Sequence, residues 1–467
     1  MSAQDEVPNP GFGGGTGMVG YDGGANERAH AVAVDSSGNV YVAGTQNDND
    51  FLLLKYGPTG TLLWTRLLLL GDGELNAVVV DNATGDVTVA GSYGGGWEMY
   101  VLRYTGNGDL YGDDDPLNPV GLTPFGNQNW IGAAVNDRFV FSNNSSYVTG
   151  LVMDASGELY LTGWEDDGIS IYGLTMKLDT HGHRYGDSSS PDVATTSFGN
   201  SEYGDGNGTS DAADFNLSGS DRFYSIARDS ATGHLYVAGE SSGVPLVAKY
   251  DSSGLLVEPF GNGDYDGNTT SDHLVLPFNN GQFYALAVDG AGNILAAGAY
   301  VAGSDNDYFV VKLTPAGVLI EPFGNFDLDG NTINDAIVLD SGFGDDRIYG
   351  MAIDNAAGFF VVTGTFGVGG GTEIRTMKFA TATGVQLHSL SYKPAGFSSE
   401  ARAIALGSFF VAGFESNGAG EDIRLIKYSS PPPAPDNGDN DGVGCGMIGL
   451  EALMLLGLIR IFRGRAR

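Results

Sequence analysis

Two stretches of the sequence gather enough side-chain oxygen to bind a hard cation. FGNGDYDGNTTSD at 260–272 and FGNFDLDGNTIND at 323–335 place their acids at the same positions. Calcium takes about six to eight oxygen ligands, which protein loops supply from alternate positions around a glycine. A solvated turn is the alternative, because tight loops also use Asp, Asn and Gly to bond their own main chain. The candidate calcium ligands are Asp264, Asp266, Asn268, Asp272, Asp327, Asp329, Asn331 and Asp335.

Neither stretch follows the EF-hand pattern, since both lack the glutamate that closes an EF-hand loop. Their spacing resembles the calcium loops of propeller blades in integrin-like proteins, with a shifted final ligand. A third stretch, FGNSEYGDGNGTSD at 198–211, keeps part of the pattern in Asp205, Asn207 and Asp211. We expect calcium as the only cofactor.

Few other residues suggest chemistry. His181 and His183 have a spacing suited to a transition metal, but no third ligand is adjacent. The sequence contains no HExxH, Walker or CxxC motif, and no catalytic residue is assigned. Aromatic side chains can stack on a sugar or pack between strands. The tryptophans that offer this choice are Trp64, Trp97, Trp130 and Trp164.

The charge of the chain limits its partners. Acidic residues outnumber basic ones by 57 to 22, and the formal net charge is −35. Such a surface repels phosphate backbones, so we expect no nucleic-acid partner. The single cysteine, Cys445, excludes an intramolecular disulfide framework.

A repeat organises most of the chain. Each copy has an apolar strand, a turn of small residues, a second strand that ends in Gly, and a third strand that ends in a basic residue. The first strand ends in Asp in every copy except the shortened seventh. A weaker fourth strand follows. The copies of the first hairpin are VDSSGNVYVAGT (34–45), VDNATGDVTVAGS (80–92), MDASGELYLTGW (153–164), RDSATGHLYVAGE (228–240), VDGAGNILAAGA (288–299), IDNAAGFFVVTGT (353–365) and ALGSFFVAGF (405–414).

Seven units of four strands predict an all-β fold, a seven-bladed β-propeller. The last unit ends after its third strand, and GMVGYDG at 17–23 precedes the first unit. We therefore expect the N-terminal strand to complete the seventh blade. The basic residues that end the third strands predict ion pairs with the acids that end the first strands; Lys312 with Asp289 is one such pair.

The repeat, from the Asp-ended strand through VAG to FxxxKY and FGN, resembles the delta-60 and SBBP-type bacterial propeller repeats. This resemblance covers roughly residues 17–428. It implies the propeller fold and a surface or secreted protein, and it assigns no activity.

The last part of the chain has a different composition. Beyond a propeller at 1–430, residues 431–444 predict an extended linker rich in Pro, Gly and Asp. Residues 445–467 combine Gly and Cys445, a short apolar helix and an arginine cluster, and the apolar part is shorter than the ~20 residues that span a bilayer. The order resembles PEP-CTERM and GlyGly-CTERM sorting signals, which implies export and processing or lipidation at Cys445. An uncleaved membrane anchor, or a helix that docks on a partner, is the alternative.

These observations favour a non-enzymatic, monomeric propeller at the cell surface or outside the cell, anchored at least transiently by its C-terminus. We expect it to bind a protein or a polysaccharide, with calcium stiffening some loops. The alternatives are a secreted glycan hydrolase or lyase with carboxylates at the channel mouth, and a purely structural envelope protein.

Overall fold

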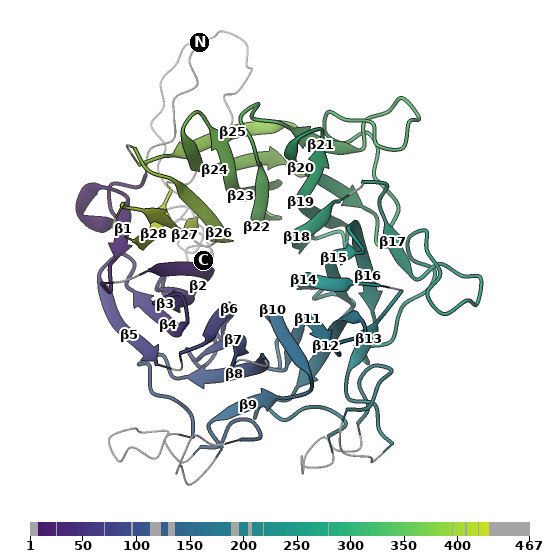
Figure 1. Ribbon diagram of the computed structural model, residues 1–467, viewed down its shortest axis with the longest axis horizontal. Coiled ribbons are helices and arrows are strands. Elements are labelled where there is room, and N and C mark those ends of the chain that lie inside the picture. Colours follow the sequence, from purple (N-terminus) through teal and green to yellow (C-terminus); the bar gives the residue numbers. More distant parts are fainter. Residues whose placement is uncertain are drawn as a thin grey trace, which may run out of the picture. The chain divides into compact units, whose positions relative to one another are not determined.

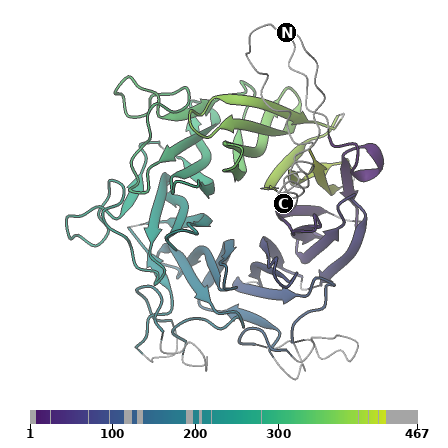
Figure 2. The same ribbon diagram turned by 180° about the vertical axis from the view of Figure 1, so that it is seen from behind.

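The structure is a computed structural model that describes residues 8–428, except 25, 70, 95–96, 113–122, 129–135, 188–195, 204–207, 218, 279, 395, 407–408 and 419. In this part of the chain, 28 strands form seven four-stranded sheets. The sheets stand around a central axis (Figure 1; Figure 2 from behind). The seven-bladed β-propeller is thus confirmed. The chain divides into two units, Met1–Ser430 and Pro431–Arg467, and the second lies outside the described residues.

The first six blades follow the chain from the inner strand to the outer strand. Blade 1 has β2 (Glu27–Val34), β3 (Val40–Gln46), β4 (Asp50–Tyr56) and β5 (Leu62–Leu68); blade 2 has β6 (Gly73–Val80), β7 (Val87–Tyr93), β8 (Glu98–Tyr104) and β9 (Arg138–Phe141). Blade 3 has β10 (Ser145–Met153), β11 (Leu159–Asp166), β12 (Ile171–Leu178) and β13 (Ala213–Phe215); blade 4 has β14 (Asp221–Arg228), β15 (Leu235–Ser241), β16 (Val244–Tyr250) and β17 (His273–Val275). Blade 5 has β18 (Gln282–Val288), β19 (Ile294–Ala302), β20 (Asp305–Leu313) and β21 (Ala336–Leu339); blade 6 has β22 (Arg347–Asp354), β23 (Phe359–Val368), β24 (Gly371–Ala380) and β25 (Gln386–Tyr392).

Blade 7 is built from both ends of the described chain. It comprises β26 (Ser399–Ala405), β27 (Phe410–Ser416), β28 (Glu421–Lys427) and β1 (Met18–Tyr21), which follows a short 3-10 helix at Gly13–Gly15. Strand β1 pairs antiparallel with β28, and Met18 lies opposite Ile426. Figure 1 shows the purple β1 beside the yellow β28. The predicted closure by the N-terminal strand is confirmed.

A glycine of each second strand faces a β-bulge in the inner strand. In blade 1 the pairing of Gly44 with Ala29 is followed by a register shift that leaves His30 as the extra residue. A Cβ atom at Gly44 would lie 1.9 Å from the main-chain oxygen of Arg28. The equivalent glycines of the other six blades have the same close approach, from 1.7 to 2.0 Å. The glycine that ends each repeated hairpin is therefore required by the bulge.

Apolar cores fill the seven junctions between blades. Each hydrophobic cluster joins two neighbouring blades, as Tyr41 and Leu53 of blade 1 do with Val87 and Val89 of blade 2. Burial of these side chains is the main favourable contribution to folding. Among the described residues, no helix is both long enough and apolar enough for a membrane crossing.

The basic residues at the ends of the third strands tie five of the blades to the next one. Two of the expected ion pairs are present among the described contacts, between Lys312 and Asp289 at 3.0 Å and between Arg103 and Asp81 at 3.8 Å. More often the cation donates to a main-chain oxygen of the following blade, a bond that strand-by-strand reasoning did not predict. These bonds join Lys55 to Gly106 (2.7 Å), Arg103 to Thr180 (2.9 Å), Lys249 to Pro315 (3.0 Å), Lys312 to Thr381 (2.9 Å) and Lys427 to Pro58 (3.3 Å).

The repeated FGN triplet is structural, and blade 5 shows how. Phe323 is buried, and the Gly324 N–H donates to the oxygen of Thr383 in blade 6 at 2.9 Å. The amide of Asn325 accepts from the Val338 N–H and donates to the Val338 oxygen, both at 2.9 Å. The side-chain amide of the asparagine thus bonds the outer strand in the way that the main chain of a neighbouring strand would. The same pair of bonds joins Asn127 to Val140, Asn200 to Asp214 and Asn262 to Val275.

The substitution Asn325→Ala tests this role. It removes two exposed hydrogen bonds to β21, each contributing about 0.5–1.5 kcal/mol. We expect a lower midpoint of urea unfolding, followed by circular dichroism. Asn107→Ala is the control, because that side chain is exposed and bonds no described residue. Equal midpoints for the two variants would contradict the structural role of the triplet.

Candidate functional site

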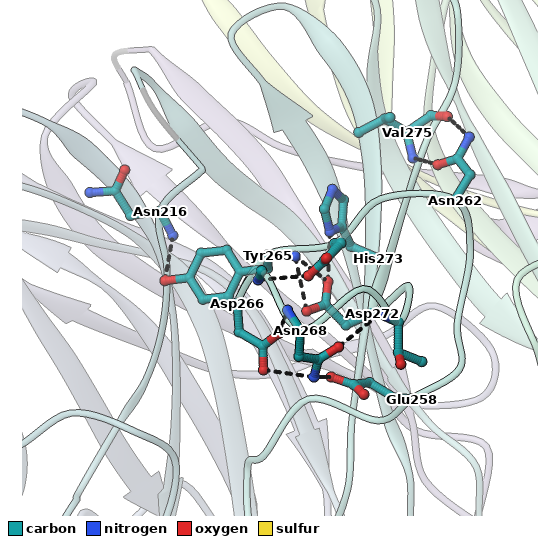
Figure 3. Close-up of polar contacts among 12 residues, drawn as sticks. Asn216, Glu258, Asn262, Tyr265, Asp266, Asn268, Asp272, His273 and Val275 are labelled. Carbon is teal, nitrogen blue, oxygen red and sulfur yellow. Dashed lines mark hydrogen bonds and ion pairs between the residues drawn. The ribbon is translucent and has the colours of Figure 1, made fainter.

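The two acidic loops lie between the third and fourth strands of blades 4 and 5. The blade 4 loop connects β16 with β17, and the blade 5 loop connects β20 with β21. Figure 3 shows the blade 4 loop, where polar side chains turn toward one another. The two loops have matching hydrogen bonds, so the likeness of their sequences is also a likeness of structure.

The predicted ligands divide into two groups. Asp264 faces the main chain of its own loop, where it accepts from the N–H groups of Gly267 (2.7 Å) and Thr269 (2.8 Å). Asp327 does the same for Gly330 (2.7 Å) and Thr332 (2.7 Å) in blade 5. These two acids hold the loop shape, which is the Asx-turn role of aspartate.

The other predicted acids meet a glutamate that motif reasoning did not include. Carboxylate oxygens of Glu258, Asp266 and Asp272 lie within 4.8 Å of one another. The amide nitrogen of Asn268 lies 2.7 Å from Glu258 and 3.0 Å from Asp266 (Figure 3). The repeated EPFGN at 258–262 and 321–325 was the available signal for this glutamate.

Blade 5 repeats the cluster with Glu321, Asp329 and Asp335, again within 4.8 Å. Asn331 donates to Glu321 at 2.7 Å and to Asp329 at 3.1 Å. Three of the four predicted side chains in each loop therefore converge, together with one additional carboxylate.

The last aspartate of the loop is buried in every blade that carries it, from 0 to 2% exposed. In two blades an arginine balances its charge: Arg138 lies 3.0 Å from Asp137, and Arg184 lies 2.9 Å from Asp211. In blade 4 a histidine contacts it, with Nδ1 of His273 at 2.8 Å from Asp272. The third predicted loop is the one that ends in Asp211, and its Asp205 and Asn207 lie outside the described residues.

Blade 5 lacks such a cation in the described part of the chain. Leu319 stands where blade 3 has Arg184, and Ala336 stands where blade 2 has Arg138. The Leu328 N–H donates to Oδ1 of Asp335 at 2.8 Å, and the Asp329 N–H also acts on this carboxylate, but no described side chain donates to it. Burial raises the pKa of Asp335, and the charges of Asp329 and Glu321 act in the same direction. A buried, unbalanced carboxylate with other oxygens nearby is chemically suited to a metal ion.

The bulges build a second site at the centre of the ring. A cavity of about 630 Å³ opens at one end of the channel. The same bulged side chains also line a cavity of about 260 Å³ further along it, so they form a ring between the two cavities. The ring consists of His30, Asn76, Thr149, Tyr224, Tyr284, Tyr349 and Arg402.

Aromatic faces form one side of the channel mouth. The rings of Tyr224, Tyr284 and Tyr349 follow one another at centroid distances of 5.6 and 5.0 Å. Trp164 stacks on Tyr147 at 3.8 Å, and both line the cavity. Burial raises the pKa of Tyr284 to about 12, so its hydroxyl stays protonated at neutral pH.

Charged groups in the mouth are paired with one another. Arg402 donates to Glu400 at 2.7 Å and lies 4.2 Å above the ring of Tyr349. Arg28 pairs with Glu421. Glu74 accepts from Asn76 at 2.8 Å. The mouth thus offers planar donors and acceptors that are held in place, with no strong excess of either charge.

Among the titratable side chains of the ring, His30 has the ordinary pKa that lies nearest to physiological pH. Its Nδ1 lies 3.2 Å from the main-chain oxygen of Leu75 and 3.1 Å from the amide oxygen of Asn76. Burial lowers the pKa of His30, and the positive charge of Arg402 acts in the same direction, while Glu74 opposes it. The imidazole is therefore neutral at pH 7.

The other residues considered from sequence have local roles. Trp64 donates to the oxygen of Gly106 in the next blade at 3.2 Å. Trp97 packs on Tyr147 at 4.9 Å, so both tryptophans pack between blades. Nδ1 of His183 lies 3.2 Å and Nδ1 of His181 lies 3.9 Å from Asp179, within a turn. Trp130 and Cys445 lie outside the described residues.

Comparison with known proteins adds little about function. No family model matches the sequence, and no curated protein does. Among solved structures, the polysaccharide lyase Uly1 is 12% identical over 85% of this chain and 90% of its own, with a TM-score of 0.43. Sqt1 from Chaetomium thermophilum, bound to the N-terminus of ribosomal protein L10, is 11% identical over 87% and 98%, with a TM-score of 0.44. Kuenenia stuttgartiensis hydrazine synthase is 10% identical over 87% and 99%, with a TM-score of 0.48. At these values the likenesses carry no argument about activity or ligands.

Substitution of the two equivalent aspartates by asparagine should have opposite effects in the presence of a chelator. Asp335→Asn removes an unbalanced buried charge, so we expect a higher unfolding midpoint at pH 7, by about 1–3 kcal/mol in free energy. Because the folded pKa of Asp335 is raised, the metal-free protein loses stability as pH rises from the ordinary aspartate range through that pKa, and the gain should disappear at acidic pH.

Asp272→Asn is the matched variant, and it weakens the contact with His273, so its midpoint should fall. Thermal unfolding of both variants between pH 4 and pH 7 measures the two effects. A fall in midpoint for Asp335→Asn at pH 7 would show that its charge is already compensated.

Proposed function

We propose that the protein is an exported, cell-surface binding protein that holds a polysaccharide at the channel mouth. The observation that supports this most is the wall of Tyr224, Tyr284 and Tyr349 facing paired polar groups across a cavity of about 630 Å³. Sugar rings present apolar faces that pack on aromatic side chains and hydroxyl groups that bond to planar polar ones.

The charge balance of the mouth favours an uncharged glycan. Arg402 and Arg28 are already paired with Glu400 and Glu421, so an anionic ligand would have to displace a carboxylate. The same pairing favours binding over glycan cleavage, since these carboxylates are engaged as hydrogen-bond acceptors. Location at the cell surface rests on the resemblance of residues 445–467 to sorting signals.

Loss of one aromatic ring should weaken glycan binding. The full-length protein is screened against immobilised polysaccharides, and the dissociation constant of the best ligand is measured by calorimetry. We expect Tyr284→Ala to bind at least ~10-fold more weakly, which corresponds to about 1.4 kcal/mol. The control is Phe326→Ala, which removes an exposed aromatic ring from the blade 5 loop, outside the mouth.

The proposal fails if no glycan binds, or if Tyr284→Ala binds as tightly as Phe326→Ala. Protein ligands captured in the same screen would instead favour a peptide-binding mouth.

We also propose that calcium binds the blade 5 loop through Glu321, Asp329 and Asp335. Support comes from the full burial of Asp335 beside the carboxylates of Glu321 and Asp329, and from the absence, among the described residues, of the arginine that the equivalent aspartate has in blades 2 and 3. The ligands are oxygen atoms only, which suits calcium better than zinc or copper. Calcium outside the cell would lower the cost of burying this charge.

Calcium should raise the thermal unfolding midpoint of the full-length protein, because a ligand that binds only the folded state stabilises it. Asp335→Asn should reduce this rise, and Asn107→Ala should leave it unchanged. A midpoint that does not move between chelator and millimolar calcium would remove the proposal.

A further inference from the structure

Three more carboxylates converge where blade 5 adjoins blade 6. Asp307 lies at the start of β20, the end of that strand away from the acidic loop. Asp340 follows β21, and Asp346 directly precedes β22. Oxygens of the three side chains lie within 4.8 Å of one another. The cluster therefore joins the last two strands of one blade to the first strand of the next.

Asp307 is the unusual member. It is 8% exposed, and no described group donates a hydrogen bond to it or pairs with its charge. Other blades that have an acid at this strand position supply donors. Asp50 accepts from Asn47 and Gly71, Glu98 from Tyr100 and Ser142, Glu373 from Arg375 and Ser391, and Asp422 from Asn417.

In blade 5 the same position faces acids instead of donors. Burial raises the pKa of Asp307 to about 6, and the charges of Asp340, Asp305 and Asp346 act in the same direction. The two nearby arginines have other partners: Arg347 pairs with Asp345 at 3.1 Å, and Arg375 pairs with Glu373 at 2.6 Å. No described cation forms an ion pair with the cluster, although the positive charge of Arg375 lowers the pKa of Asp346 in part against the effect of burial.

Asp346 is fixed in position by the main chain. It is fully buried and accepts from the N–H groups of Ser341 (2.6 Å) and Gly367 (3.0 Å). The Ser341 side chain also bonds this carboxylate, whereas Oδ1 accepts from Gly367 and keeps a lone pair for a further partner. Asp340 is exposed, so an ion can reach the cluster from solvent.

We propose that Asp307, Asp340 and Asp346 bind one calcium ion that fastens blade 5 to blade 6. The ligands are hard oxygens without a nearby histidine or cysteine ligand in the cluster, which suits calcium. Calcium–oxygen distances of ~2.3–2.6 Å allow one ion to bridge oxygens that lie as far apart as these do. The ion compensates the charge of Asp307, as hydrogen-bond donors do for the equivalent acids of blades 1, 2, 6 and 7.

The junction of blades 7 and 1 has acids at the same three positions. Asp422, Asp22 and Glu27 correspond to Asp307, Asp340 and Asp346, and their oxygens also lie within 4.8 Å. There Asn417 donates to Asp422 at 2.9 Å. The repetition shows that this corner of the fold brings three side chains together wherever the sequence places acids there.

Calcium content tests the proposal. The full-length protein is dialysed to equilibrium at pH 7.5 against micromolar to millimolar calcium, and the bound ion is counted by mass spectrometry. We expect Asp307→Asn to bind one calcium ion fewer per chain than the wild type, and Asp340→Asn, at an exposed position, to show the same loss.

Two further variants separate this site from the others. Asp335→Asn reports on the blade 5 loop, and a double variant with Asp307→Asn should lose one ion more than either single variant if both sites bind. Asp50→Asn, at the equivalent strand position of blade 1, should keep the wild-type content. An unchanged calcium content in folded Asp307→Asn and Asp340→Asn would overturn the proposal, whatever Asp335→Asn does.

Discussion

The close contact between a glycine of each second strand and the main chain of the inner strand shapes the whole molecule. A Cβ atom at Gly44 or its six equivalents would overlap a main-chain oxygen, so only glycine permits the bulge opposite it. The bulge turns one side chain of each inner strand toward the axis. Seven such turns create the ring that narrows the channel and lines its mouth. The fold and the ring at the channel mouth therefore have the same physical origin.

Buried acids recur at fixed places in the repeat, and the blades differ in how they balance the charge. The last aspartate of the third connection is paired with arginine in blades 2 and 3 and with histidine in blade 4. In blade 5 both ends of β20 carry an acid without a balancing cation among the described residues, Asp307 at one end and Asp335 beyond the other. A chain with 57 acidic and 22 basic residues has few cations for these positions, and metal ions can take their place.

The sequence was sufficient for the architecture because every blade repeats the same pattern. Seven hairpins, the missing fourth strand of the last unit and the strand at 17–23 together predicted the blades and their closure, as β1 and β28 confirm. The pairing of Lys312 with Asp289 was also predictable, because an acid at the end of the first strand and a basic residue at the end of the third strand recur at the same positions of the repeat. The hydrogen bonds from these basic residues to the next blade were not predictable. Their acceptor is a main-chain oxygen, which any residue type can provide.

The sites were harder to predict for a related reason. In the acidic loops, spacing identified Asp329 and Asp335 but not Glu321, which precedes the FGN triplet. The spacing also could not distinguish Asp327, which bonds its own loop, from a ligand. The ring of the channel takes one residue from each of seven distant strands. Blades 4, 5 and 6 share tyrosine at this position, but the other four blades each have a different residue type, so no motif common to all seven marks the ring.

That variability has a structural cause. A bulged residue such as Tyr284 or Arg402 lines the channel. It does not pair with the second strand, whereas the residues before and after it do. Its identity therefore contributes little to blade packing, whereas the glycine opposite it cannot change. A propeller of this kind can exchange all seven ring residues, and with them its ligand, while it keeps the same fold.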